Sequence, residues 1–267
     1  MAGRAVLLLP LRLLHLSRYN GQTMQTASAL DNISIVLVRT KTPGNIGAVA
    51  RCMMNMGLSR LILVRPPRDI GGDALKLAAG AETIIESART CATLREAIEG
   101  HHLVIGTSRH RSRLRKNVRD PRITARDIVP LLGPARVAIV FGPEVNGLER
   151  DDLALCQELI AIPSSDDFPS LNLSHAVMVV AYELFVASQS TDAGPGPDLA
   201  DAADRERFFD HLQLTLASIN FLDRDHPERI MYSLRQLFGR ARPDRRELSI
   251  LRGILTAIDR RDRGSRR

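Results

Sequence analysis

Short apolar runs alternate with helical patterns over most of this sequence, and this alternation constrains the fold more than any other feature. The apolar runs begin with ISIVLV at Ile33 and end with ELIAIP at Pro163. A long helical pattern, SLNLSHAVMVVAYELFVAS, closes the series at Ser188. Continuous apolar runs of this length are typical of strands in a parallel sheet that is covered by helices on both faces. We therefore predict an α/β domain.

The predicted α/β domain spans residues 32–190, and the composition changes after it. Residues 191–203 are rich in Gly, Pro and Asp and have no apolar period, which predicts a flexible linker. In residues 204–262 apolar positions recur at helical spacing, as in RERFFDHLQLTLASINFL. This pattern predicts a small helical module joined to the α/β domain.

The first 31 residues form a leader that we exclude from the fold. No acidic residue precedes Asp31, and Pro10 and Arg12 interrupt an apolar run that is too short to span a bilayer. We expect this leader to be disordered, or its start to be misassigned, with translation beginning near Met24. An acid-free leader that contains Arg and Ser is also compatible with an organellar transit peptide.

The charge balance favours a polyanionic partner. The net charge is +7 and the sequence pI is about 10.0, which favours nucleic acid over membrane, although a generally basic proteome would give the same balance. Aromatic residues make up 4% and Trp is absent, which argues against binding mainly by base stacking. Residues 109–126 contain eight Lys or Arg and one acid, and residues 224–267 contain thirteen Arg and six acids. We interpret the first stretch as a phosphate-contacting surface, whereas the second could equally be a solvated helix face.

The three cysteines, Cys52, Cys91 and Cys156, are widely separated and form no C-x-x-C pair. An odd number at wide spacing predicts free thiols in a reducing compartment rather than disulfides or a metal site. We therefore expect a cytoplasmic protein without a metal and without a membrane partner.

The glycine-rich stretch TPGNIGAVARCMMNMG, residues 42–57, follows the first predicted strand, but it matches neither common phosphate loop. A P-loop needs Lys after its last glycine, and none follows Gly47. A dinucleotide-binding fingerprint needs a third glycine and a later acid, whereas this chain has Ala50 and a second strand that ends in VRPPR. A nicotinamide-dependent oxidoreductase is therefore disfavoured. The stretch instead carries Asn45, suited to cap a helix, and Arg51 almost two turns later.

Two further motifs place polar residues after predicted strands. VAIVFGPEVNGLERDDL leads from a strand into Gly142 and Glu144, where small residues leave room for a ligand. IAIPSSDDFPSLNLSHAVMVVAYE carries Ser170 and Asn172 at the head of an apolar helix. For these two residues, helix capping is the alternative to a functional role.

Taken together, NIGAVAR, FGPEVNGL and IPSSDDFPSLNLSHAVMVVAYE resemble motifs one, two and three of the SpoU, or TrmH, group of SPOUT RNA methyltransferases. The tail RIMYSLRQLFGRARPDRRELSILRGILTAI is similar to the helical extension of the TrmJ branch. Pro143 departs from that branch, which often carries Arg there. The resemblance implies an α/β fold with a trefoil knot at the carboxyl end of the sheet. It also implies a homodimer and S-adenosylmethionine as methyl donor.

The resemblance also assigns site residues. The cofactor positions that it implies are Thr107, Ser108, Arg109, Gly142, Ile162, Pro169, Ser170 and Leu171. The catalytic positions are Arg51 together with Asn45, Glu144, Ser170 and Asn172. We expect Asn45 and Glu144 to orient the arginine and the substrate, and Asn172 to fix the bend of motif three.

The role of Arg51 stays open between two interpretations, because the pKa of a guanidinium exceeds about 12. It could lose its proton transiently beside a substrate phosphate and act as the base. It could instead hold a phosphate and stabilise the developing alkoxide electrostatically, which we favour.

The resemblance implies a tRNA ribose 2'-O-methyltransferase that depends on S-adenosylmethionine and acts on cytidine or uridine 32 of the anticodon loop. Residues 204–262 would then be a tRNA-binding extension. One alternative is a ribosomal RNA 2'-O-methyltransferase with the same site. The other is an RNA-binding protein that has lost catalysis, against which the intact set of catalytic residue types argues.

Overall fold

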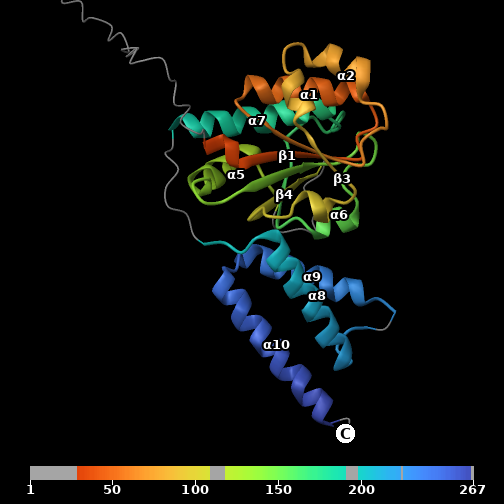
Figure 1. Cartoon of the computed structure of the whole chain (residues 1–267), viewed down its shortest axis with the longest axis vertical. Coiled ribbons are helices and arrows are strands. Elements are labelled where there is room, and N and C mark those ends of the chain that lie inside the picture. Colours follow the sequence, from red (N-terminus) through yellow and green to blue (C-terminus); the bar gives the residue numbers. More distant parts are fainter. Residues whose placement is uncertain (1–28, 109–117, 191–197, 224, 266–267) are drawn as a thin grey trace, which may run out of the picture.

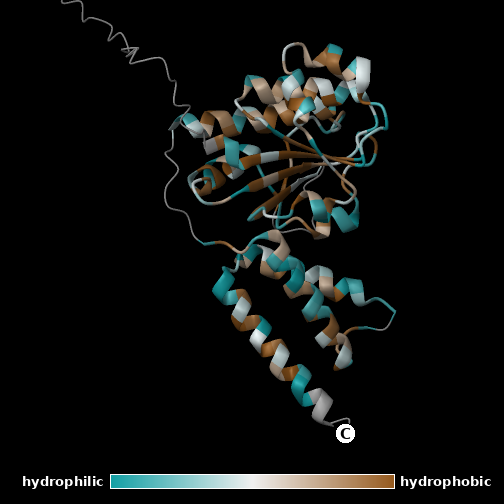
Figure 2. Cartoon of the chain, viewed as in Figure 1, coloured by the Kyte–Doolittle hydropathy of each residue, from teal (hydrophilic) through white to brown (hydrophobic). Residues whose placement is uncertain are grey.

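The computed structural model of the chain describes residues 29–108, 118–190, 198–223 and 225–265. Within them, an α/β domain built on one sheet lies above a module of three helices (Figure 1). Figure 2 shows that the central strands are hydrophobic along most of their length, whereas the helices of the module alternate hydrophobic and hydrophilic residues. No described helix is both long enough and apolar enough to cross a membrane.

All neighbouring strands of the sheet are parallel, in the order β3-β2-β1-β6-β4-β7-β5. The strands are β1 (Ile33–Val38), β2 (Arg60–Val64), β3 (Arg89–Cys91), β4 (Leu103–Thr107), β5 (Val118–Arg119), β6 (Val137–Phe141) and β7 (Glu158–Ile160). The helices of this domain are α1 (Pro43–Asn55), α2 (Gly71–Ala78), α3 (Glu82–Glu86), α4 (Leu94–Ala97), α5 (Pro121–Ile128), α6 (Arg150–Ala154) and α7 (Leu173–Ser190), with short 3-10 turns at Ala29–Asn32 and Val129–Leu131. The predicted parallel α/β domain is confirmed. The knot stays a prediction.

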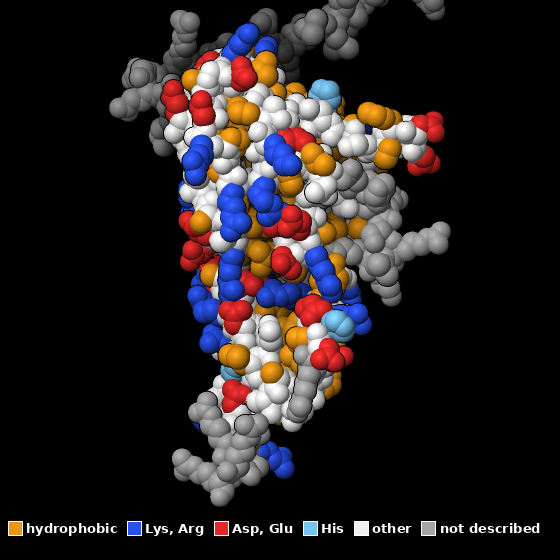
Figure 3. Space-filling view, turned by 90° about the vertical axis from the view of Figure 1, so that its right-hand side faces the viewer, with side chains coloured by type: hydrophobic (Ala, Val, Ile, Leu, Met, Phe, Trp, Pro, Cys, Tyr) orange, Lys and Arg blue, Asp and Glu red, His pale blue; other side chains and the backbone are white. Residues whose placement is uncertain are grey.

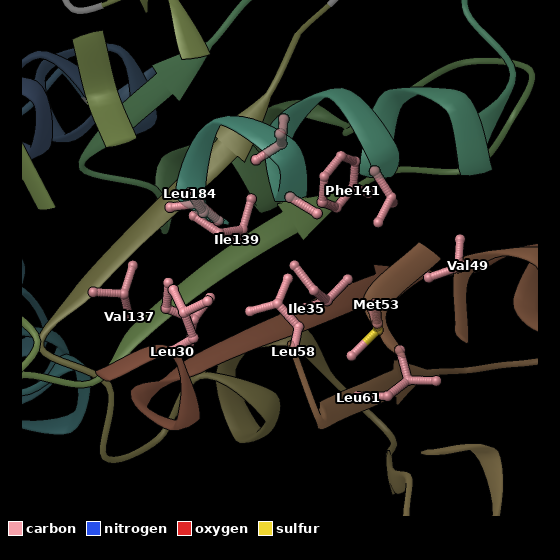
Figure 4. Packing of buried hydrophobic residues seen from close by; sticks show 14 of the residues in the cluster. Leu30, Ile35, Val49, Met53, Leu58, Leu61, Val137, Ile139, Phe141 and Leu184 are labelled. Carbon is pink, nitrogen blue, oxygen red and sulfur yellow. The ribbon is translucent and has the colours of Figure 1, made fainter. Parts of the chain in front are cut away.

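The sheet is buried on both faces, which explains its continuous apolar runs. Along β1, Ile35 and Leu37 belong to a core shared with α1 and α7, whereas Val36 and Val38 face a second core on the other side of the sheet. Figure 4 shows the first core, where Ile139 of the sheet lies beside Leu184 of α7 and Ile35 lies beside Leu58. In Figure 1, α1 and α7 cover one face and α6 lies on the other.

The glycines of the 42–57 stretch serve helix packing. A Cβ atom at Gly47 would lie 2.0 Å from the carbonyl oxygen of Ala74 in α2, and one at Gly44 would lie 2.9 Å from a methyl carbon of Leu77. Only glycine allows the backbones of α1 and α2 to approach this closely. At Gly47 the missing side chain lets the backbone of α2 approach α1, and at Gly44 it leaves room for the side chain of Leu77.

The helical module consists of α8 (Ala202–Ser218), α9 (Pro227–Ala241) and α10 (Arg245–Ser265). Its core is built around three aromatic rings, with the ring of Phe208 at 5.2 Å from that of Phe209 and 5.0 Å from that of Phe238. The buried Arg205 fastens α8 to the α/β domain, because its guanidinium donates hydrogen bonds to the backbone carbonyl oxygens of His102 and Ala200.

Several predicted boundaries differ from the structure. Leu30 is buried in the first core, so the ordered domain begins before residue 32. The described part of the predicted linker is packed rather than flexible, because Leu199 forms an antiparallel bridge with Asp244 and Ala200 is buried. The first helix of the module begins at Ala202 rather than at residue 204, and the last helix extends beyond residue 262 to Ser265.

Parts of other predictions lie outside the described residues. They are residues 1–28 of the leader, 109–117 of the first basic stretch, 191–197 of the linker, and 224, 266 and 267 of the second basic stretch.

Candidate active site

The three sequence motifs meet at the carboxyl edge of the sheet. Because β1, β6 and β4 are adjacent and parallel and β7 pairs with β4, the loops that follow β1, β6 and β7 leave the sheet at one edge. The first loop leads into α1, the second leads into α6, and the third leads into α7. Residues that are far apart in sequence are thereby brought within hydrogen-bonding distance.

The carboxylate of Glu144 joins the first two loops. It accepts hydrogen bonds from the backbone N–H groups of Lys41 at 3.1 Å and Thr42 at 3.2 Å. It also accepts a bond of 2.8 Å from the side-chain amide of Asn45. The amide oxygen of Asn45 in turn accepts a bond of 3.2 Å from the side chain of Asn172. One polar network therefore links all three motifs.

Asn172 also organises the start of α7. Its side-chain oxygen accepts bonds from the backbone N–H of Ser174 at 2.9 Å and from the Ser174 hydroxyl at 2.7 Å. This is the geometry of a helix cap, in which a side-chain oxygen satisfies an N–H group that has no partner within the helix. Capping and participation in the network are therefore two roles of one side chain.

The network keeps Glu144 ionised. Burial opposes ionisation, but the hydrogen bonds from Asn45 and from the backbone amides of Lys41 and Thr42 together lower the pKa of Glu144 below its usual value. The carboxylate already accepts three hydrogen bonds. It is therefore suited to hold loops in place and poorly suited to remove a proton from a substrate.

A cavity of about 390 Å³ lies beside this network, at the carboxyl ends of β4, β6 and β7. Seven of the eight predicted cofactor residues line it, namely Thr107, Ser108, Gly142, Ile162, Pro169, Ser170 and Leu171. The eighth, Arg109, lies outside the described residues. Glycine is required at position 142, because a Cβ atom there would lie 2.3 Å from backbone atoms of Gly147 and Leu148.

Arg51 stands apart from the cavity. Its side chain is exposed on α1, it is not among the cavity-lining residues, and none of the described residues forms a hydrogen bond or ion pair with its guanidinium. Arg51 lies six residues after Asn45, which places it about 9 Å further along α1 and roughly 120° around the helix. Asn45 and Glu144 bond to each other and to the neighbouring loops, and their predicted role in orienting Arg51 stays a prediction.

The cavity includes residues that sequence reasoning did not single out. Phe141, Leu148, Ile160 and Leu173 supply apolar wall, and Asn146 supplies a polar group. Leu148 and Asn146 belong to the motif FGPEVNGL, so membership of the motif was a usable signal. The backbone amides that bind Glu144 carry no side-chain signal at all.

Comparison with known proteins decides the family. The SpoU rRNA Methylase family matches residues 32–182, which is more than half of the chain. The chain belongs to the SpoU methylase family. The C-terminal domain of the tRNA methyltransferase TrmJ matches residues 203–267, so the family match and this second match together cover the α/β domain and the helical module.

Individual relatives agree on the branch. The chain is 43% identical to the tRNA (cytidine/uridine-2'-O-)-methyltransferase TrmJ of Salmonella typhimurium, over 88% of this chain and 99% of the relative. It is 41% identical to the tRNA (cytidine/uridine/adenosine-2'-O-)-methyltransferase TrmJ of Pseudomonas aeruginosa, over 88% of this chain and 96% of the relative. The crystal structure of TrmJ from Z. mobilis superposes with a TM-score of 0.76 at 33% identity, covering 85% of this chain and 98% of that one. Within the family, the chain belongs to the TrmJ branch.

Proposed function

We propose that this chain is a tRNA 2'-O-methyltransferase that uses S-adenosylmethionine to methylate the ribose of cytidine or uridine at position 32. The observation that carries the proposal is the Glu144–Asn45–Asn172 network, which joins three motifs beside one cavity. The relatives in Salmonella and Pseudomonas are named for methyl transfer to the 2'-oxygen of tRNA nucleotides. Such an enzyme is expected to work in the cytoplasm.

The cavity suits a nucleoside-containing donor. Its volume of about 390 Å³ falls in the range of small-molecule sites. Leu148, Ile160 and Ile162 offer apolar contact for a base, and Thr107 and Ser108 offer hydrogen-bonding groups for a polar portion of the ligand. S-adenosylmethionine, when bound, supplies an electrophilic methyl group on a sulfonium centre.

The residues of the chain must then manage the proton of the ribose hydroxyl. Among the described residues that line the cavity, Glu144 is the only one with a carboxylate, imidazole, amine or guanidinium group. Its carboxylate is already engaged by three donors, so it is not the base. Arg51 holds a substrate phosphate and stabilises the developing alkoxide electrostatically, while the proton of the ribose hydroxyl passes to solvent water.

The position of Arg51 supports a homodimer. Because Arg51 does not line the cavity of its own chain, a second copy brings its Arg51 to that cavity. The face of α1 that carries Arg51 also carries the exposed Met54, and the neighbouring α7 exposes Tyr182 and Val186. Apolar side chains exposed on two adjacent helices are suited to association of two copies.

Basic side chains support binding of tRNA. Figure 3 shows Lys and Arg side chains gathered along the middle of one face, interspersed with acidic ones. The net charge of +7 provides long-range attraction to a polyanion. These charges position the RNA through its phosphates, while the cavity and its rim select the nucleotide.

Methyl transfer to defined tRNA transcripts tests the function. The purified chain is mixed with labelled S-adenosylmethionine and tRNA that carries cytidine, uridine or adenosine at position 32, and the modified nucleotide is located by mass spectrometry. We expect transfer to cytidine and uridine, and no transfer when position 32 carries deoxyribose. The adenosine substrate is included because the Pseudomonas relative is named for adenosine as well. Absence of transfer to every tRNA would refute the proposal.

Mixed dimers test the shared site. Arg51→Ala and Glu144→Gln are each expected to be nearly inactive as homodimers. In a dimer of one copy of each, one cavity combines an intact Glu144 with an intact Arg51 from the other copy, so part of the activity returns. If mixed dimers form and remain as inactive as their parents, Arg51 acts within its own chain.

A further inference from the structure

The buried carboxylate of Glu158, on the sheet, binds an arginine of the helical module. Glu158 begins β7, and its side chain is 8% exposed. Its Oε1 accepts a hydrogen bond of 3.0 Å from Nε of Arg242, and the same oxygen also contacts Nη2 of that arginine. Its Oε2 lies 3.7 Å from Nη1 of Arg119. One buried anion therefore serves two cations from different parts of the molecule.

The two arginines lie on either side of the boundary between the domains. Arg119 belongs to β5, which pairs with β7, and it also contacts Asp127 at 2.5 Å. Arg242 terminates α9 with a backbone φ of 47°, in the left-handed region that non-glycine residues seldom adopt. This left-handed residue ends α9, and its side chain contacts Glu158.

The backbone of α9 is also packed closely against the start of β7. A Cβ atom at Gly239 would lie 3.3 Å from the Cα and carbonyl oxygen of Gln157. Gln157 is itself fixed, because its side-chain oxygen accepts a hydrogen bond of 2.8 Å from the backbone N–H of Val104 in β4. The contact between α9 and the sheet therefore leaves little room for sliding or rotation.

The same strand leads into the cavity. Ile160 lies two residues after Glu158 and lines the cavity, and its carbonyl oxygen accepts a hydrogen bond of 2.9 Å from the backbone N–H of Ser108, which is another lining residue. Strand β7 thus carries the helical module at its first residue and the cavity at its last.

We propose that Glu158 is a positioning residue that sets the register between the helical module and the active-site cavity, so that a tRNA held by the module presents its target ribose to the cavity. This inference rests on the proposed function. Burial makes this ion pair matter for docking, because a buried charge that loses its partner raises the free energy of the folded protein. An exposed charge that loses its partner is solvated by water instead. An exposed ion pair between the same two parts, Arg95 and Asp210, has side chains that are 51% and 53% exposed and makes a matched control.

Steady-state kinetics with tRNA tests the proposal. We expect Glu158→Gln to raise KM for tRNA by about tenfold or more, because breaking a buried pair loosens the docking of α9. The value of kcat and the dissociation constant of S-adenosylhomocysteine should change by less than about threefold, since the cavity-lining side chains are intact. Asp210→Asn should change all three by less than about threefold. Hydrogen exchange in α9 should be faster in Glu158→Gln than in Asp210→Asn.

The outcomes separate this inference from the proposed function. Wild-type transfer to tRNA decides the proposed function. If the wild type is active and Glu158→Gln keeps its KM, or raises it no more than Asp210→Asn, the positioning role is wrong. If Glu158→Gln does not fold, Arg242→Asn breaks the same pair from the module side, because asparagine tolerates the left-handed backbone. The same change in KM is then expected, and its absence overturns the inference.

Discussion

At the scale of single residues, Glu144 has the largest structural role in the candidate site. Replacing it by Gln puts an N–H donor where the carboxylate faces three other donors. Hydrogen bonds to a charged group contribute about 1.5–3 kcal/mol each, so loss of even one disorders the loops at the cavity. We expect kcat for tRNA methylation to fall by about tenfold or more. Glu86→Gln, at an exposed position, is the control and should leave kcat unchanged.

The buried His101 predicts a loss of stability in acid. Burial, aided by the positive charges of Arg89 and Arg136, lowers the pKa of His101 from 6.5 to about 4. Its Nε2 lies 2.9 Å from the Ser34 hydroxyl oxygen. Between pH 6.5 and about pH 4, His101 is protonated in the unfolded chain but stays neutral in the folded protein. Stability from this group is therefore complete above pH 6.5 and declines as the pH falls toward 4.

The difference in pKa corresponds to about 3 kcal/mol at most. Urea unfolding of the wild type and of His101→Gln at pH 7.5 and pH 5 measures it. The wild type should lose more of its unfolding free energy than the variant, because Gln does not titrate. Equal losses in the two proteins would show that His101 is protonated without penalty in the folded state.

The residue types of the site could be predicted from sequence, but their connections could not. The strand ends and motif matches led to eight of the residues that line the cavity, among them Gly142, Glu144 and Ser170. The bonds of Glu144 go partly to backbone amides, which look alike in every sequence. The distance between Arg51 and the cavity depends on how far α1 turns between Asn45 and Arg51. The motif alone does not reveal whether Arg51 acts at the cavity of its own chain or at that of a second copy.

At the scale of elements, the contact between α1 and α2 makes a strong prediction. Gly47→Ala places a methyl group 2.0 Å from the carbonyl oxygen of Ala74, so the two helices must move apart. Overpacking of this kind destabilises a fold by about 1–3 kcal/mol or more. Because α1 also carries Asn45, activity should fall together with stability. The melting temperature measures the first effect and methyl transfer the second.

Gly72→Ala is the matched control for this substitution. Gly72 lies in α2, and a Cβ atom there would meet nothing within 4 Å. Alanine is the better helix former by about 1 kcal/mol, so this variant should be as stable as the wild type or more stable. If Gly47→Ala behaves like Gly72→Ala, the close approach of α1 and α2 has no energetic consequence.

Elements with long apolar runs were predictable, and short edge elements were not. Strands β1, β2, β4 and β6 are buried on both faces and appear in the sequence as apolar runs. Strands β3 and β5 have three and two residues with no such run, so pairing at the sheet edge alone defines them. Residues 73–89 carry one helical pattern in the sequence, yet they form two helices, α2 and α3, because Ala79 adopts a left-handed conformation that ends α2.

At the scale of the whole molecule, the module and the α/β domain form a continuous packed unit over the described residues. The composition of residues 191–203 predicted flexibility, yet Ala200 and Ala202 are buried and Ala202 belongs to a core of the sheet. Local composition indicates how flexible a segment is in isolation. Tertiary packing nevertheless fixes the conformation of the last residues of this segment. The charges on both parts can therefore act on a tRNA as one surface.

The salt dependence of binding tests whether that surface acts on phosphates. Each phosphate that the protein neutralises releases counterions, so the logarithm of the association constant falls linearly with the logarithm of salt concentration. With a net charge of +7, we expect the affinity for tRNA to fall more than about tenfold between about 50 and 200 mM salt. Binding of S-adenosylhomocysteine, which bears no phosphate, should change little over the same range. A flat response for tRNA would mean that uncharged contacts dominate, and that the arginines of the helical module are merely solvated.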